Sequence, residues 1–245
     1  MPEFDTLFWA MGAMSLAAGL MRGFAGFGSA LMLSPLLSLY YGPVAAVLII
    51  GIMEIAVSIQ LLPRALREAQ RPVVVPVTAA AVLMMPLGVV ILNVVDGQTI
   101  ATVIALIVLA FVAVLASGWR YAGAQRLPYS LGVGAVSGVL ISSTSIGGPP
   151  FLIYMMAGQQ TAQQVRANII VFFAVLELII PFVLWAGGKF DWGLFIQGGF
   201  YCPTYMLGAW IGSRLFRESS ETLYRRIALV ILTAVAAYGL IVPLL

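Results

Sequence analysis

The sequence contains no histidine and only one cysteine, Cys202. These absences exclude a disulfide within the chain, zinc sites built from cysteine and histidine, and mechanisms that need an imidazole base or a haem ligand. Cys202 lies in an apolar stretch, and we interpret it as a small buried hydrophobic residue. No nucleophile motif of the Gly-x-Ser-x-Gly type is present. We therefore expect no enzymatic activity, no catalytic residue, no cofactor and no metal site.

Charged residues are scarce as well. Only 9% of the 245 residues are Asp, Glu, Lys or Arg, and 62% are hydrophobic, whereas a soluble domain carries roughly 25% charged residues. The net charge of +3 is small and dispersed, so we expect no nucleic-acid partner. An acidic start with Glu3 and Asp5 argues against a cleavable signal peptide. The composition predicts an all-α integral membrane protein whose surroundings are the lipid bilayer.

Six apolar stretches are long enough to cross a bilayer core, which needs about 20 helical residues. They are 43–63, 72–92, 98–118, 163–187, 191–212 and 222–243. Two longer apolar regions, 6–41 and 128–160, are each interrupted near the middle by glycine, serine or proline. Each region is predicted to form a hairpin that starts and ends on one side of the membrane. The lengths leave open whether the hairpins are re-entrant or consist of two full spans.

The positions of Lys and Arg predict the orientation, because short loops rich in these residues stay on the cytoplasmic side. Arginines cluster after 43–63, after 98–118 and between the last two spans, so we expect these loops in the cytoplasm. The turns at 93–98 and 187–191 carry few positive charges and should face outside. The amino terminus is then expected outside. The first hairpin should enter from outside and the second from the cytoplasm.

The two halves share motifs in the same order. Those of the first half are Gly19-x-x-x-Gly23, Gly26-Phe27-Gly28-Ser29 and Glu54; those of the second are Gly134-x-x-x-Gly138, Ser145-Ile146-Gly147-Gly148 and Glu177. The offsets are 115, 119 and 123 residues. Gly-x-x-x-Gly alone is more typical of helix packing, but the agreement of motifs with topology favours a duplication.

We therefore predict an inverted-topology repeat, an organisation typical of secondary transporters. Each half would be a broken or re-entrant hairpin plus three spans. Residues 1–120 form the first repeat (hairpin 6–41, spans 43–63, 72–92 and 98–118), and residues 121–245 the second (hairpin 128–160, spans 163–187, 191–212 and 222–243).

The two interruptions are the candidate binding site. A broken helix in a membrane leaves backbone groups unpaired, which is tolerated only inside protein or beside water. Half-helix amino termini bind anions, and the run of hydroxyls in the second interruption adds hydrogen-bond donors that suit an oxyanion. A divalent cation would instead need several carboxylates. The alternative is that the hydroxyls bond to carbonyls of their own helix, although four in a row beside Gly-Gly-Pro-Pro are not expected to fit one regular helix. The candidate substrate-binding residues are Arg22, Gly26, Gly28, Ser29, Ser142, Ser143, Thr144, Ser145, Gly147 and Gly148.

Charged residues within the apolar regions are the other candidates. Arg22 precedes the first interruption and offers a guanidinium fork to an oxyanion; the alternative is an interfacial charge that reaches the membrane surface. For Arg166 the interfacial interpretation is favoured. Glu54 and Glu177 each cost roughly 2.5–3.5 kcal/mol at a helix centre. We assign proton coupling to them, with a structural hydrogen bond or an ion pair to Arg22 or Arg166 as the alternative.

The glycine-rich motifs resemble those of a known family. The segment Gly19-x-x-x-Gly23-x-x-Gly26-x-Gly28-Ser29-Ala30 followed by Pro35, and Gly134-x-x-x-Gly138 leading to Ile146-Gly147-Gly148-Pro149-Pro150, are similar to the paired motifs of the sulfite exporter TauE/SafE family, or toluene sulfonate uptake permeases. The resemblance extends over essentially the whole chain, although Ser29 and Ala30 stand where further glycines are common and the second motif departs more. It implies a multi-pass carrier in the bacterial inner membrane for sulfite, thiosulfate or small organosulfonates, with export the commonest direction and no cofactor.

The expected function is thus secondary transport of a small sulfur-containing oxyanion, coupled to protons or to the membrane potential. Two alternatives remain open: a passive anion channel of the same architecture, and a carrier for a small carboxylate. The sequence does not indicate which anion is carried. A homodimer is compatible with the sequence, but nothing in it supports one.

Overall fold

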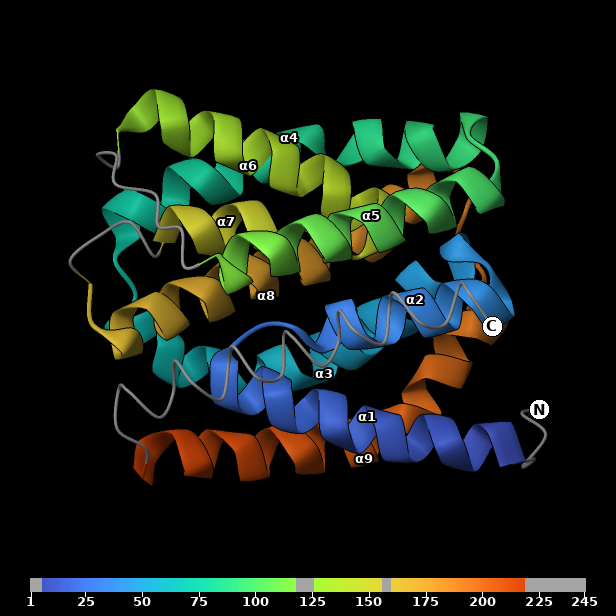
Figure 1. Cartoon of the computed structure of the whole chain (residues 1–245), viewed down its shortest axis with the longest axis horizontal. Coiled ribbons are helices and arrows are strands. Elements are labelled where there is room, and N and C mark those ends of the chain that lie inside the picture. Colours follow the sequence, from blue (N-terminus) through green and yellow to red (C-terminus); the bar gives the residue numbers. More distant parts are fainter. Residues whose placement is uncertain (1–5, 118–125, 156–159, 219–245) are drawn as a thin grey trace.

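The computed structural model describes residues 6–117, 126–155 and 160–218, and every element in these ranges is an α-helix (Figure 1). By length and composition, α3, α4, α6 and α8 are able to cross a membrane. For the described residues, the prediction of an all-α protein with helices able to span a membrane is confirmed. The helices are α1 (Thr6–Ala25), α2 (Ser29–Tyr41), α3 (Pro43–Glu68), α4 (Arg71–Val94), α5 (Gly97–Ala116), α6 (Leu127–Thr144), α7 (Gly148–Met155), α8 (Ala162–Ala186) and α9 (Trp192–Glu218).

The helices coincide with the predicted spans and hairpins. Spans 43–63, 72–92, 98–118, 163–187 and 191–212 correspond to α3, α4, α5, α8 and α9. Several helices are longer than the apolar stretch, because a helix continues beyond the hydrocarbon core that hydropathy detects. The first interrupted region consists of α1 and α2, and the second of α6 and α7. The predicted span 222–243 lies outside the described residues.

Each interruption is a short left-handed turn between two helices. After α1 ends, Gly26 adopts a φ of 82°, and Gly28 with a φ of 95° precedes α2. After α6 ends, Ser145 adopts a φ of 63°. Gly26 and Ser145 are separated by the same 119 residues that align the two motifs. The two turns therefore occupy matching places in the two halves.

The first broken hairpin packs on a helix of the second half. A Cβ atom at Gly19 of α1 would collide with the backbone of Tyr205 in α9, and one at Gly23 would collide with the backbone of Ala209. Glycine is required here because the two backbones touch. The contacts advance together along both helices, so α1 and α9 run parallel.

The second broken hairpin packs in the same way on a helix of the first half. A Cβ atom at Gly134 of α6 would collide with the backbone of Val77 in α4, and one at Gly138 would collide with that of Ala81. These helices also run parallel. The helices α1 and α6 are thus each held, backbone to backbone, by a helix from the other half of the chain.

The helices α3 and α8 lie between the two parallel pairs (Figure 1). They contact each other, and α3 also contacts α9 while α8 contacts α4. The two interruptions, the first break after α1 and the second break after α6, therefore lie close to the centre of the bundle. The middle turns of α3 and α8 face this centre, and these turns carry the two buried glutamates.

Candidate functional site

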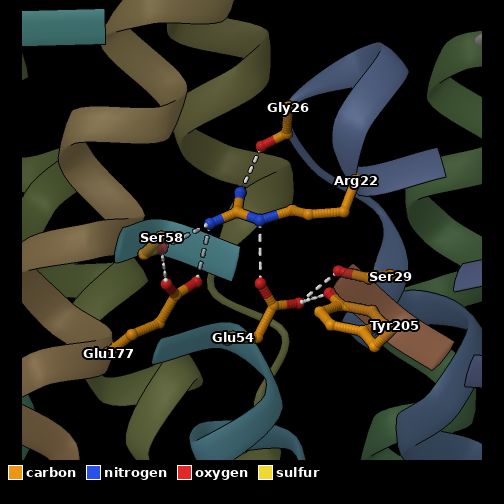
Figure 2. Close-up of polar contacts among 7 residues, drawn as sticks. All are labelled: Arg22, Gly26, Ser29, Glu54, Ser58, Glu177 and Tyr205. Carbon is orange, nitrogen blue, oxygen red and sulfur yellow. Dashed lines mark hydrogen bonds and ion pairs between the residues drawn. The ribbon is translucent and has the colours of Figure 1, made fainter. Parts of the chain in front are cut away.

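Arg22 lies at the centre of a buried cluster of polar side chains (Figure 2). Its side chain, in the last turn of α1, is only 1% exposed. The Nε atom lies 2.8 Å from Oε2 of Glu54, and Nη2 lies 2.9 Å from Oε1 of Glu177. The Nη1 atom donates to the carbonyl of Gly26 within the first break. The interfacial interpretation of Arg22 is therefore wrong, because its guanidinium points into the protein.

Three hydroxyl groups complete the cluster. Ser29 and Tyr205 donate to Oε1 of Glu54, the latter over 2.5 Å, and Ser58 donates to Glu177. Glu54 thus accepts two hydrogen bonds and forms an ion pair with Arg22, and Glu177 accepts two hydrogen bonds, one of them from Arg22. Hydrogen bonds of this kind stabilise an ionised carboxylate in a buried place.

The positions of these side chains follow from the helices that carry them. Glu54 and Ser58 are four residues apart in α3, so they share one helix face. Arg22 lies at the carboxyl end of α1, where the helix dipole favours a positive charge. The contact between α3 and α8 brings Glu177 within reach of both Arg22 and Ser58. The cluster therefore joins helices from both halves of the chain.

Arg166, at the start of α8, supports the first break from a different direction. Its Nε donates to the carbonyl of Phe24 over 3.1 Å, and its Nη2 donates to the carbonyl of Gly23 over 2.5 Å. The guanidinium also lies 4.5 Å from the ring centre of Phe216. Because Arg166 is only 7% exposed, the interfacial-anchor interpretation is wrong. It caps the carboxyl end of α1, whose last carbonyls lack helical partners.

A cavity of about 40 Å³ adjoins the cluster and lies between the two breaks. Room for a water molecule needs at least about 10–15 Å³ on this measure, so the cavity is large enough for a few waters. Apolar side chains such as Phe27, Ile50, Ile141 and Phe173 form much of its wall. Seven of the predicted site residues also line it: Arg22, Gly28, Ser29, Glu54, Ser145, Gly148 and Glu177.

The hydroxyl run of the second break is placed differently from the expectation. Ser142, Ser143 and Thr144 form the last turn of α6. Their hydroxyls lie 2.8, 2.7 and 2.7 Å from the carbonyls of the residues four positions earlier. These three hydroxyls follow the alternative interpretation, in which they bond to carbonyls of their own helix. The expectation that all four do not fit one regular helix agrees with the structure, because Ser145 lies beyond the end of α6. Ser145 alone leaves the helix and reaches the cavity wall.

Two of the predicted glycines shape the breaks without lining the cavity. Gly26 turns the chain with its positive φ and offers its carbonyl to Arg22. A Cβ atom at Gly147 would lie 2.6 Å from the carbonyl oxygen of Ser137 and 2.7 Å from Cβ of Ile141. Glycine at this position lets the second break lie directly against α6.

The two half-helices that begin at the cavity offer different numbers of backbone donors. The cavity wall includes Gly28 and the first three residues of α2, whose amides have no partner within the helix. The helix α7 begins with Gly148, Pro149 and Pro150, and proline has no amide hydrogen. The amino terminus of α2, next to Arg22, is therefore the stronger position for a negative group.

A sequence model of the family described as Sulfite exporter TauE/SafE matches residues 11–239. The chain belongs to the TauE/SafE family. The match includes both breaks, both buried glutamates and all nine described helices except the first residues of α1. No curated protein matches the chain, and no solved structure does. This match confirms the resemblance that the sequence motifs indicated. The family is one of membrane transporters.

Two residues of the cluster in this TauE/SafE protein were not expected from the sequence. Ser58 had a detectable signal, because it follows Glu54 by one helical turn and so shares its face. Tyr205 had none, since tyrosine in apolar helices is mostly an interfacial residue. Its role becomes visible only when α9 packs on α1 and brings the hydroxyl to Glu54.

Proposed function

We propose that this TauE/SafE protein is a secondary transporter of the bacterial inner membrane that exports a small sulfur-containing oxyanion, such as sulfite, thiosulfate or an organosulfonate. The anion binds in the cavity between the two glycine-rich breaks. The observation that carries the proposal is the guanidinium of Arg22, buried in the wall of a cavity that also contains the amino terminus of α2. A planar fork of donors beside free backbone amides matches an oxyanion.

The candidate binding residues then have two kinds of role. Arg22, Gly28, Ser29, Ser145 and Gly148 line the cavity and contact the anion. The others hold the breaks in shape: Gly26, Ser142, Ser143, Thr144 and Gly147. Ser34 of α2 adds a link between the breaks, since its hydroxyl donates over 2.7 Å to the carbonyl of Thr144.

The proposed architecture is an inverted repeat of residues 1–120 and 121–245. The exchange of helices supports it, since α1 packs on α9 as α6 packs on α4. The matching left-handed turns at Gly26 and Ser145 support it too. In this arrangement both hairpins are re-entrant and turn near the level of Glu54 and Glu177. Such a design places a substrate between two elements that open alternately to the two sides.

The proposed orientation has the amino terminus outside. The end of α3, the start of α4 and the end of α9 carry arginines and lie at one end of the bundle (Figure 1, left). Positive charge at membrane helix ends is retained on the cytoplasmic side. The helix α1 begins at the opposite end, which is then the outer one.

Glu54 and Glu177 are proposed to couple transport to protons. They are buried, they correspond in the two halves, and both pair with the cation that would hold the anion. A change in the charge of either carboxylate therefore changes how strongly Arg22 attracts a ligand.

Binding and flux measurements test the proposal. The purified protein would be titrated with sulfite, sulfate, thiosulfate, sulfoacetate, taurine and pyruvate, and transport would be followed in proteoliposomes. We expect saturable flux and preference for a sulfur oxyanion. A preference for pyruvate would instead indicate a carboxylate carrier, unsaturable flux would indicate a channel, and absence of binding by every anion would reject the proposed site.

A further inference from the structure

The cluster around Arg22 sets one positive charge against two carboxylates. Arg22 pairs with both Glu54 and Glu177. At the offset of 115 residues that aligns Gly19-x-x-x-Gly23 with Gly134-x-x-x-Gly138, the position that corresponds to Arg22 in the second half is Ser137, which is uncharged. Among the described residues, Arg22 is the only cation in the cavity wall. With both carboxylates ionised, the cluster is negative in an environment where uncompensated charge is costly.

An anion does not simply add to this cluster. The guanidinium nitrogens of Arg22 already have partners in Glu54, Glu177 and the carbonyl of Gly26. A ligand would find the fork occupied and would bring further negative charge beside two carboxylates. Binding therefore requires that one carboxylate release the guanidinium and lose its charge.

We propose that the anion binds together with one proton: the proton neutralises Glu177, and the anion replaces Glu177 on the guanidinium of Arg22. The inference rests on the proposed function, because it concerns the same site. One ion pair breaks, between Arg22 and Glu177, and one forms, between Arg22 and the anion. The proton remains on the Glu177 carboxyl group, so a monoanion leaves the net charge of the cluster unchanged.

Glu177 takes the proton because, apart from Arg22, its ionised form has one hydrogen-bond donor among the described residues whereas that of Glu54 has two. Glu54 keeps hydrogen bonds from Ser29 and Tyr205 when it shares Arg22 with a ligand. Within the part of the chain that the structure describes, Glu177 has only Ser58 besides Arg22, and a neutral Glu177 can donate to the Ser58 hydroxyl instead. Among the described residues, the charged groups that face Glu177 are Arg22 from α1 and Glu54 from α3, and the Tyr205 phenol of α9 faces Glu54.

Cotransport in one direction follows from this exchange. Proton and anion each raise the affinity of the other by the same factor, so both cross together and the carrier is a symporter for them. Export by such a symporter runs on an outward anion gradient that exceeds the inward proton gradient, because a proton gradient that is acidic outside drives the pair inward. A monoanion with its proton carries no net charge, and the membrane potential does not drive it. An exchanger of anions for protons would require the opposite linkage, in which protons weaken anion binding.

The test is calorimetric titration of the purified full-length protein with methanesulfonate, thiosulfate, pyruvate and sulfite, from about pH 5.5 to about pH 8.5. Each titration is repeated in two buffers of different ionisation enthalpy, which gives the number of protons taken up; the protonation of sulfite itself is subtracted. We expect about one proton per bound anion, and a Kd that rises about tenfold per pH unit at the alkaline end.

Variants and vesicles sharpen the result. Glu177→Gln should bind the anion without proton uptake and with a flat pH profile. Glu68→Gln is the matched control, because Glu68 pairs with Arg64 away from the cavity, and it should behave like the wild type.

In proteoliposomes, an acidic exterior should drive accumulation of a monoanion, whereas a potassium diffusion potential of either sign should not.

Two outcomes overturn the inference while leaving the proposed function intact: anion binding without proton uptake at any pH, and anion binding that tightens as the pH rises. Failure of all four anions to bind rejects the proposed function as well. If Glu177→Gln does not fold, the proton count of the wild type still decides, because it needs no variant.

Discussion

Arg22 and Glu177 are separated by 155 residues in the sequence, yet Nη2 of Arg22 lies 2.9 Å from Oε1 of Glu177 in the buried centre of the protein. The pair joins α1 of the first half to α8 of the second. On the other side of the guanidinium, Glu54 brings in α3. One cation thus compensates two carboxylates on the two central helices, and it also holds the first break through Gly26.

Removal of the Arg22 charge should destabilise the protein strongly. Arg22→Met leaves Glu54 and Glu177 buried without their cation, which costs about 3–5 kcal/mol when one partner of a buried pair is lost. Thermal unfolding in detergent measures this loss. The triple variant with Glu54→Gln and Glu177→Gln should recover most of the stability, because the uncompensated charges are gone. Arg67→Met, at an exposed position, should change stability by no more than about 0.5 kcal/mol. Wild-type stability of Arg22→Met alone would show that the carboxylates are neutral at rest.

The shape of the Arg22 side chain should matter as well as its charge. In Arg22→Lys a single ammonium replaces three nitrogens that now contact Glu54, Glu177 and Gly26. A point charge cannot reproduce a planar fork, so we expect anion affinity to fall at least about tenfold, or about 1.4 kcal/mol. Stability should fall less than in Arg22→Met because the charge remains. The Kd for the preferred anion measures the effect, with Arg67→Lys as control; an unchanged Kd would place the anion away from the guanidinium.

Much of the fold was predictable from the sequence because it depends on local properties. Apolar length located α3, α4, α5, α8 and α9, and glycine and proline located both breaks. The charged residues of the site were also recognised, since Arg22, Glu54 and Glu177 are costly in a membrane. Their mutual pairing was only one of several alternatives, because it depends on how helices far apart in the sequence pack.

The hydroxyl run shows why the rest was not predictable. Whether Ser142, Ser143 and Thr144 face a ligand or their own helix depends on where α6 ends, and one residue decides this. The helix continues to Thr144 and turns at Ser145, which removes three hydroxyls from the cavity and leaves one. Composition and spacing do not specify that end point.

The glycines at the two parallel interfaces should tolerate no larger side chain. A Cβ atom at Gly23 would collide with the backbone of Ala209, so Gly23→Ala should cost about 1–3 kcal/mol through helix displacement. Gly12, in the same helix, has nothing within 4 Å of such a Cβ atom, so Gly12→Ala should be neutral or slightly stabilising. In the second half, Gly138→Ala and Gly132→Ala form the equivalent pair. Unfolding midpoints of the four variants test this, and equal midpoints within each pair would contradict the close packing.

Ser145 places a side chain in the cavity wall at the expense of backbone strain. Among the described residues it is the only one other than glycine with a positive φ, 63°, a conformation that costs such residues about 1–2 kcal/mol. Ser145→Gly removes the strain and the hydroxyl together, so we expect a gain in stability of about 0.5–1 kcal/mol. Anion binding should weaken by about threefold to tenfold, as for the loss of one hydrogen bond.

Ser145→Ala separates the two effects, because it retains the strained φ and loses only the hydroxyl: it should weaken binding equally without any gain in stability. Unfolding midpoints and Kd values for both variants decide the matter. Wild-type affinity in Ser145→Gly would show that the hydroxyl does not contact the anion, and the strain at this turn would then have no role in binding.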